Sequence, residues 1–466
     1  MKQLFFATVI LMSSVLFAGE KPNIVFVMTD DQGWGETGYQ THPVLKTPNL
    51  DKMAESGLRF NRFYSGGPVC SPTRACVLTG RTHDRCGVLN HGYSLRLQEK
   101  TLAQALKNAG YITGHFGKWH LNGFSGPGVP ILADDNHNPG CFGFDSWVSV
   151  TNFFDLNPLM SRKGTIEEFS GDSSDVTVNE AVKFMKTNAK SGKPMFVLIW
   201  FGSPHLPAKA LDQDKAAFKD LDAASANHYG ELVAMDRSIG TLRRELREMG
   251  LAGNTLLFFC SDNGGLPGMT PETVGGLRGY KGSLFEGGIR VPGIIEWPAV
   301  IKPRITNYPV CVTDMFPTIV DLLGLPNDSM ILPIDGISLK PLFEKELTTR
   351  EKPLGFRYQE QQAWIENRYK IVKMKGQGKT FQLFDLEKDP HETTDIIKDH
   401  PEIAKKMKAD FELWNASIDA SFAGQDYPEK KLTDDPPPQR RWTGNIGYQP
   451  YLNDWKKRWE YQKFIK

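Results

Sequence analysis

The sequence predicts an α/β fold, with a mostly parallel central sheet flanked by helices and a smaller C-terminal α+β domain. Three continuous apolar runs, at residues 23–29, 194–201 and 255–260, have the pattern of strands that are buried on both faces. Amphipathic helical segments alternate with these runs, which is typical of a parallel sheet. Beyond about residue 345 the pattern changes to short strands and one helix.

Two helical segments are clearly delimited. Thr101 has the position of an N-cap for a short helix that Gly110 ends. A longer helix is predicted over residues 227–249, because apolar residues recur there on one face: Leu232, Met235, Ile239, Leu242 and Leu246. Both segments lie between predicted strands, as an α/β domain requires.

The chain divides into four predicted parts. Residues 1–19 read as a signal peptide, and residues 20–345 form the main domain. Residues 346–420 form a small antiparallel sheet plus a helix, with strands inside 363–386 and the helix over 401–418. Residues 421–466 contain three consecutive prolines and several Trp and Tyr residues, and are predicted to be an extended arm on the surface.

The first residues predict export. Lys2 precedes an apolar run over residues 4–17 and the small pair Ala18-Gly19, which is the pattern of a secretory signal peptide. The run is short for a membrane span, which needs roughly 20 residues. We therefore expect a periplasmic or extracellular protein with no membrane association after cleavage. An uncleaved anchor is the alternative, and the cleavage position stays open.

Composition excludes few function classes but does limit the partners. The formal net charge is +1, so general attraction to nucleic acid or to anionic membranes is not expected. Any anion binding must come from a local cluster of cations. Of the six cysteines, Cys76 and Cys86 could pair in an exported protein, but the sequence does not decide this.

Acidic residues follow two of the predicted strands. Asp30 and Asp31 come directly after the first strand, and Asp262 and Asn263 come shortly after the third. Ligands bind beyond the carboxyl ends of parallel strands, so the two pairs suggest one shared cation site. Oxygen ligands favour calcium or magnesium over zinc. Capping of the following loops is the alternative for each pair.

The segment CSPTR at residues 70–74 predicts an anion site. It follows a Gly-Gly-Pro turn, which puts Cys70 at or near a helix N-terminus and Arg74 one turn later on the same face. Helix N-termini and Arg side chains both favour tetrahedral oxyanions. Ordinary packing is the alternative for this segment taken alone.

Three further loops bring cations to strand ends. They contribute Lys118 with His120, then His205, and finally Lys281 in a Gly-rich loop. A single histidine or lysine in such a position is more often structural. Together with Arg74 and the acidic pairs, however, these residues describe a pocket for a doubly charged tetrahedral anion.

At these positions the chain resembles the type I, formylglycine-dependent sulfatases of the alkaline phosphatase superfamily, such as arylsulfatases and N-acetylgalactosamine-6-sulfatases. The resemblance covers about residues 22–415 in order, and it rests on several motifs: NIVFVMTDDQGW (23–34), CSPTRACVLTGR (70–81), GKWHL (117–121), Pro204-His205, SDNG (261–264), KGSLFEGG (281–288) and LFDLEKDPHE (383–392). It implies an alkaline-phosphatase-like fold with a catalytic domain over residues 20–345.

The resemblance also implies a chemistry. Cys70 would be oxidised to formylglycine by a maturation enzyme, and the hydrated aldehyde would attack the sulfur of a sulfate ester. One calcium ion would be bound by Asp30, Asp31, Asp262, Asn263 and the modified Cys70. The sulfate would be surrounded by five side chains: Arg74, Lys118, His120, His205 and Lys281. His205 or Lys281 would protonate the leaving alcohol, and His120 would remove a proton from the second hydroxyl of the hydrate.

The expected substrate is a sulfated carbohydrate or an aryl sulfate. Loops at residues 82–94 and 124–154, together with the C-terminal arm, are the candidates for selecting it. The polar residues of the two loops suit sugar hydroxyls or simply cap turns: His83, Asp84, Arg85, Asn90, His91, Asp134, Asp135 and His137. The alternatives are a phosphoester or phosphonate hydrolase of the same superfamily and a non-catalytic glycan-binding protein. A further alternative is a secreted thiol protein in which Cys70 pairs with Cys76 or Cys86.

Overall fold

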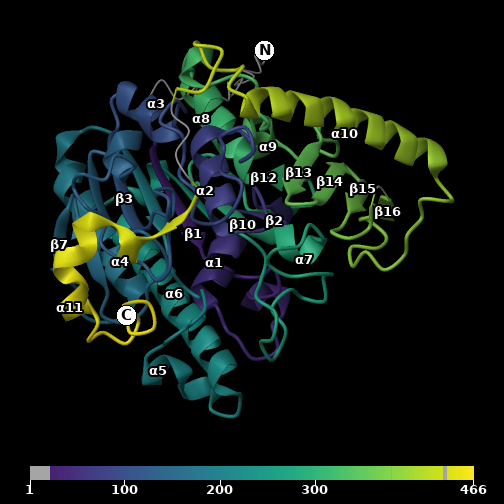
Figure 1. The fold of residues 1–466 in the computed structure, drawn as a ribbon. Coiled ribbons are helices and arrows are strands. Elements are labelled where there is room, and N and C mark those ends of the chain that lie inside the picture. The colour runs from purple at the N-terminus through teal and green to yellow at the C-terminus, as the bar shows by residue number, and fades with distance from the viewer. Residues whose placement is uncertain (1–20, 379, 434–437) are drawn as a thin grey trace, which may run out of the picture.

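A large mixed sheet forms the centre of the molecule (Figure 1). The structure is a computed structural model that describes residues 21–378, 380–433 and 438–466, so the predicted signal peptide lies outside the described residues. The sheet has eleven strands, ten of them in the order β11-β2-β10-β9-β1-β8-β3-β5-β6-β7, with β12 paired to β2. The predicted α/β class with a mostly parallel central sheet is confirmed.

Five parallel strands make up the middle of this sheet. They are β9 (Thr255–Ser261), β1 (Asn23–Thr29), β8 (Met195–Trp200), β3 (Ile112–Lys118) and β5 (Ser146–Val150). Antiparallel neighbours flank them: β10 (Arg290–Glu296) and β2 (Leu58–Tyr64) on one side, and β6 (Leu159–Arg162) and β7 (Thr165–Glu168) on the other. The short strands β11 (Arg304–Thr306) and β12 (Val310–Cys311) pair in parallel with β2.

The apolar run of β1 is continuous because helices cover both faces of the sheet. Ile24, Phe26 and Met28 belong to one core cluster, whereas Val25 and Val27 belong to another. Side chains alternate along a strand, so each face needs its own apolar set. The first cluster includes residues of α2 (Cys70–Thr79), α3 (Leu102–Asn108) and α8 (Met315–Leu323). The second includes residues of α1 (Pro48–Ser56), α4 (Ser173–Asn188) and α6 (Ala223–Glu248).

Capping residues set the ends of the two predicted helices. The Thr101 side chain accepts a hydrogen bond from the backbone N–H of Gln104, whose own side chain accepts from the Thr101 N–H, so α3 begins as predicted. The longer helix α6 begins four residues earlier than predicted, at Ala223. The Asp222 carboxylate caps it by accepting from the N–H groups of Ala224 and Ser225.

The C-terminal part contains a four-stranded antiparallel sheet, β13 (Leu354–Tyr358), β14 (Gln361–Glu366), β15 (Tyr369–Lys373) and β16 (Gln382–Asp385). One face carries Ala363 and Val372 into the main core. The other face packs Trp364 and Ile371 against α10 (Pro401–Phe422). The predicted α+β part is confirmed. It is packed tightly on the main domain because both of its faces are apolar.

The last residues differ from the predicted extended arm. Residues 440–455 form β17 (Arg440–Arg441), two 3-10 turns and α11 (Leu452–Trp455), and β17 pairs with β4 (Phe124–Ser125). Trp442, Tyr448, Trp455 and Tyr461 form a small core of their own with Phe124 and Val129. The aromatic residues that suggested a surface arm therefore fold it into a compact element.

Three further helices are short: α5 (Asp212–Lys215), α7 (Glu286–Ile289) and α9 (Lys340–Glu344). Within the described residues, no helix has the length and apolar character needed to cross a membrane. All six cysteines are free thiols, so Cys76 and Cys86 do not pair and Cys70 pairs with neither of them.

Candidate active site

Two neighbouring strands deliver the acidic residues to one edge of the sheet. β1 and β9 pair in register, with Thr29 opposite Ser261, so the residues that follow them meet. The Asp31 N–H donates to Asp262 Oδ1 over 3.1 Å, and Asn263 Nδ2 donates to Asp31 Oδ1 over 2.8 Å. Asp30, Asp31, Asp262 and Asn263 are fully buried. The structure thus brings together the two pairs that the sequence singled out.

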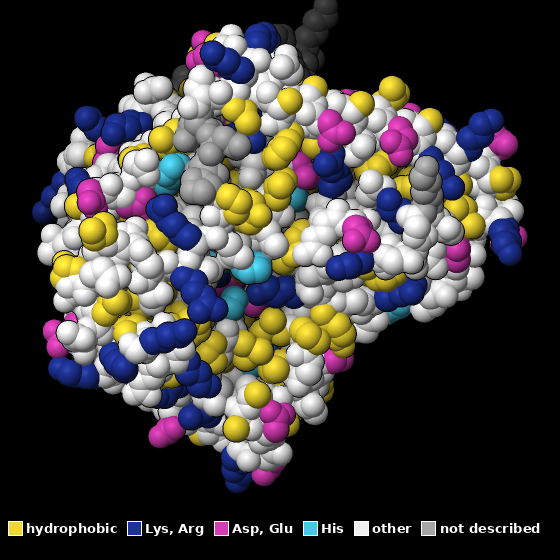
Figure 2. Space-filling view, viewed as in Figure 1, with side chains coloured by type: hydrophobic (Ala, Val, Ile, Leu, Met, Phe, Trp, Pro, Cys, Tyr) yellow, Lys and Arg dark blue, Asp and Glu magenta, His cyan; other side chains and the backbone are white. Residues whose placement is uncertain are grey.

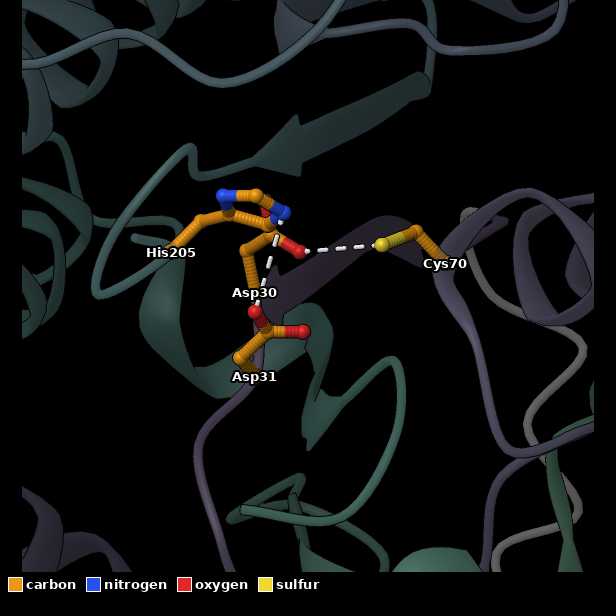
Figure 3. A group of neighbouring side chains, drawn as sticks. All are labelled: Asp30, Asp31, Cys70 and His205. Atoms are coloured by element: carbon orange, nitrogen blue, oxygen red, sulfur yellow. Dashed lines mark hydrogen bonds and ion pairs between the residues drawn. The ribbon is translucent and has the colours of Figure 1, made fainter. Parts of the chain in front are cut away.

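Cys70 is the first residue of α2, as predicted, and it points at the same edge. Its Sγ lies 3.4 Å from Asp30 Oδ1, and the side chain is buried (Figure 3). Burial raises the pKa of the Cys70 thiol, and the carboxylates of Asp30 and Asp262 raise it further against the opposing effect of two lysines. An unmodified Cys70 is therefore a protonated thiol and a poor nucleophile in this environment.

Two cations lie on the floor of the site. The Arg74 guanidinium donates to Asp262 Oδ2 over 2.7 Å and to the Lys118 carbonyl over 2.9 Å. Lys118 Nζ lies 2.5 Å from Asp30 Oδ2. Both side chains have no exposed surface. The indole of Trp200, 5.0 Å from the guanidinium carbon, supports Arg74 from one side.

Two further basic side chains lie nearer to solvent. Lys281 Nζ is 2.6 Å from Asp31 Oδ1, and His205 Nε2 is 3.8 Å from Asp31 Oδ2. Their side chains are 20% and 18% exposed, in contrast to Arg74 and Lys118. Figure 2 shows histidine side chains beside Lys and Arg in a hollow of this face. The site therefore has a buried cationic floor and a basic mouth.

His120 is buried, and its ring has no hydrogen-bond partner among the described residues. This holds for both Nδ1 and Nε2. The backbone has φ 54°, and the Ser71 hydroxyl donates to the His120 carbonyl over 2.7 Å. Burial, together with Lys118 and Arg74, lowers the pKa of His120 well below its usual value. A buried ring without a partner is available to a ligand.

The pKa values of Asp31 and Asp262 shift in opposite directions. Burial alone raises the pKa of Asp31, but Lys281 and His205 reverse this and hold it well below its usual value. Burial and the charge of Asp30 raise the pKa of Asp262 to about 7. Asp31 is therefore an anion as the site stands, whereas additional positive charge nearby would favour the anionic form of Asp262.

A cation would find suitable ligands here. Ligating atoms of Asp30, Asp31, Cys70 and His205 lie within 4.8 Å of one another. Asn263 Oδ1 is buried and has no hydrogen-bond partner in the described part of the chain. This group contains His205, which the family resemblance assigned to the sulfate, and it does not contain Asp262. Asp262 and Asn263 both hydrogen-bond to Asp31. Asp30, Asp31 and Asn263 offer oxygen donors, the ligands that hard cations such as calcium prefer, whereas Cys70 and His205 offer sulfur and nitrogen.

One neighbour of His205 could not be predicted from the sequence. The ring of Phe153, in the loop after β5, stacks on the imidazole with 4.5 Å between centroids and 7° between planes. His205 Nδ1 lies 2.6 Å from the Leu206 carbonyl, so Nδ1 carries a proton and Nε2 faces the site. Phe153 belongs to no motif, and only its position in the fold reveals this contact.

Most of the polar loop residues considered for sugar binding have structural partners. Arg85 pairs with Asp335 and bonds to α10, and His83 lies between the carbonyls of Val88 and Arg357. The His137 carbonyl accepts from the Trp119 indole, and Asp84 and Asp135 also bond within the fold. Asn90 accepts from the Tyr358 hydroxyl, and the ring of the exposed His91 bonds to Asn90. Asn90, His91 and the exposed Asp134 are therefore the members of this set still accessible to a substrate.

Comparison with known proteins agrees with the geometry. The family model described as Sulfatase matches residues 22–325, and the one described as N-sulphoglucosamine sulphohydrolase, C-terminal, matches residues 280–416. N-acetylgalactosamine-6-sulfatase of Sus scrofa is 32% identical over 370 residues, covering 72% of this chain and 68% of the relative. Arylsulfatase A of Homo sapiens is 32% identical over 364 residues, covering 70% and 68%.

A solved structure shares the fold. The crystal structure of Ps i-CgsB in complex with k-i-k-neocarrahexaose has a TM-score of 0.77 and 24% identity, and the match covers 96% of this chain and all of that one. The family model alone spans well over half of the chain. The chain therefore belongs to the type I sulfatases of the alkaline phosphatase superfamily and is a sulfuric ester hydrolase.

Proposed function

We propose that this sulfatase removes sulfate from a carbohydrate, using a formylglycine made from Cys70 and one calcium ion. The observation that carries the proposal is the gradient of burial among the cations. Arg74 and Lys118 are fully buried, whereas Lys281 and His205 are partly exposed. This arrangement suits an ester whose sulfuryl group enters first and whose alcohol faces solvent. A relative named N-acetylgalactosamine-6-sulfatase supports a sugar as that alcohol.

The residues of the floor would bind the sulfuryl oxygens. Arg74 Nε is buried and has no hydrogen-bond partner among the described residues, so it can donate to an oxyanion. The Lys118 ammonium adds a positive charge beside it. Both charges are fixed before substrate binds, so they stabilise negative charge without reorganisation.

The residues of the mouth would handle the proton of the leaving alcohol. Burial alone lowers the pKa of Lys281, but Asp31 reverses this and raises the pKa above its usual value, so Lys281 carries a proton. Burial and Lys281 lower the pKa of His205 well below its usual value. Lys281 can donate once the developing alkoxide is within reach, whereas His205 can donate only after its Nε2 has taken up a proton. His120, with both ring nitrogens unbonded in the described structure, would accept the proton that must leave residue 70.

Calcium and the modified residue complete the proposed site. When present, the hydrated aldehyde supplies a hydroxyl nucleophile, and calcium supplies positive charge and Lewis acidity. Asp30, Asp31, Asp262, Asn263 and residue 70 would hold the ion. The oxygen-rich donor set and the unbonded Asn263 Oδ1 support this assignment. The raised pKa of the Cys70 thiol supports conversion to another nucleophile.

Maturation of Cys70 and export of the chain are also part of the proposed function. A formylglycine-generating maturation enzyme must act on the Cys70 segment of the unfolded chain, because Cys70 is 1% exposed in the fold. Export to the periplasm or beyond is supported by the signal-like pattern of residues 1–19.

Turnover of matched esters tests this function. The matured protein should hydrolyse an aryl sulfate much faster than the corresponding aryl phosphate or phosphonate, and Cys70→Ala should lose at least about a thousandfold in kcat because the nucleophile is gone. Preference for the phosphate or phosphonate would instead support the related hydrolases. Sulfated glycan binding without sulfate release by fully matured protein would support a non-catalytic role.

Calcium removal tests the proposed metal site through stability. Chelation should lower the free energy of unfolding by about 3 kcal/mol relative to protein at calcium concentrations a hundredfold above Kd. Denaturant titration measures this difference. Asp31→Asn should abolish the calcium response, and magnesium serves as the ionic control. An equal response in Asp31→Asn would contradict the assignment.

Phe153 should affect the rate at which His205 protonates the leaving alcohol. Its stacked ring fixes the plane of His205, and aromatic stacking is worth about 1 kcal/mol, so Phe153→Ala should lower kcat for a sugar sulfate about fivefold. The loss should shrink for aryl sulfates with acidic phenols, which need little protonation. Phe153→Tyr should restore the rate. Phe169→Ala, a control that removes a half-buried ring not stacked on His205, should leave the ratio of kcat for the sugar sulfate to kcat for the aryl sulfate unchanged. A uniform loss on all substrates would show that the ring only supports the fold.

A further inference from the structure

Positive charge is concentrated in the last part of the chain. Residues 438–466 contain seven Lys or Arg and two Asp or Glu, a formal net charge of +5, although the whole chain carries only +1. The preceding residues are therefore net acidic. Arg440, Arg441, Lys456 and Lys463 are exposed, and none of them forms an ion pair with a described residue. We call these four residues the basic arm.

The basic arm is held on a rigid support. Trp442, Tyr448, Trp455 and Tyr461 are at most 6% exposed and pack together. The Tyr448 hydroxyl donates to the Pro130 carbonyl over 3.0 Å, which ties this element to the main domain. Charges on a fixed backbone lose less conformational entropy on binding a ligand than charges on a mobile tail.

The basic arm begins beside the mouth of the active site. The Arg440 N–H donates to the Gly123 carbonyl over 2.9 Å, three residues after His120 in the sequence. The preceding residue, Gln439, lies so close to Gly92 that a Cβ there would be 2.7 Å from Gln439 Oε1. Gly92 directly follows the accessible His91. The arm is therefore continuous with the surface from which a substrate enters.

The space-filling view agrees with this arrangement. Lys and Arg side chains gather next to the histidine-containing hollow in Figure 2, on the side of the molecule where the C-terminal residues lie in Figure 1. Arg440 interacts electrostatically with Asp135, but none of the four side chains forms an ion pair in the described part of the chain, and exposed basic side chains that are not in ion pairs attract a polyanion. A ligand that already has one sulfate in the pocket presents its other anionic groups to this surface.

We propose that the basic arm binds the neighbouring anionic sugar units of a sulfated polysaccharide while one sulfate occupies the active site. This inference rests on the proposed function, since the pocket must accept a sugar sulfate for the chain to extend along the arm. The arm then favours polymeric substrates over a single sulfated sugar, and its contribution weakens as ionic strength rises.

Binding of a defined chain tests the inference. The combined variant Arg440→Gln, Arg441→Gln, Lys456→Gln and Lys463→Gln removes the four charges. Its matched control is Lys375→Gln, Lys388→Gln, Lys398→Gln and Lys405→Gln, which removes four exposed lysines from the C-terminal α+β part. Both are made in a Cys70→Ala background, so that the probe, chondroitin 6-sulfate, stays intact.

The arm variant should bind chondroitin 6-sulfate about tenfold more weakly than its parent at low salt, and the control should bind within about twofold. In the background with Cys70 intact, kcat/KM for N-acetylgalactosamine 6-sulfate should be the same in both variants. Equal polymer affinity of the arm variant and the control would overturn the inference, as would equally tight binding of duplex DNA through the same four residues. Failure of the parent protein to hydrolyse any sulfate ester would count against the proposed function, whereas the binding comparison does not depend on turnover.

Discussion

The balance of buried charge at one sheet edge is the constraint on which the rest of the site depends. Three carboxylates and three basic side chains meet there, and they come from β1, β9, α2, β3 and the loop that carries Lys281. A buried charge is costly unless it is paired and hydrogen-bonded. The pairing of β1 with β9 and of β3 with β8 sets the distances at which these charges meet. A shift in either register would separate these buried ion pairs, and water could not reach the separated charges to solvate them.

The small C-terminal part supports the same site from behind. Lys370 of β15, fully buried, lies 3.0 Å from Glu286 and 2.9 Å from Glu392. Glu286 begins α7, five residues after Lys281, and its N–H donates to the Glu392 carboxylate. Gln361 also bonds the Gly282 carbonyl. The position of Lys281 thus depends on contacts with a second part of the chain.

The sequence predicted those elements and site residues that are marked by a local motif. The apolar runs predicted β1, β8 and β9, the N-cap position of Thr101 predicted the start of α3, and the segment CSPTR predicted the start of α2. The residues predicted to form the site lie together, because the ends of neighbouring strands must meet.

The sequence was insufficient where partners are distant. The strand β10 contains Pro292 and Gly293, which are unfavourable in strands, so its pairing with β2 and β9 is visible only in the fold. Arg85 likewise has the composition of a surface residue, and its partners Asp335 and Ser421 lie far away in the sequence. The fold of the last residues depends on Trp and Tyr rings packing against Phe124, more than three hundred residues away in the sequence. The contact of Phe153 with a histidine from another loop could not be predicted for the same reason.

We propose that Cys70 is converted to formylglycine, because burial raises the pKa of its thiol and leaves the unmodified side chain a poor nucleophile. Mass spectrometry of the tryptic peptide that spans residues 63–74, made on preparations with and without a co-expressed maturation enzyme, tests the claim most directly. An aldehyde should replace the thiol in the matured preparation, and sulfatase activity should rise in proportion to the converted fraction. Full activity in protein that retains the Cys70 thiol would contradict the claim.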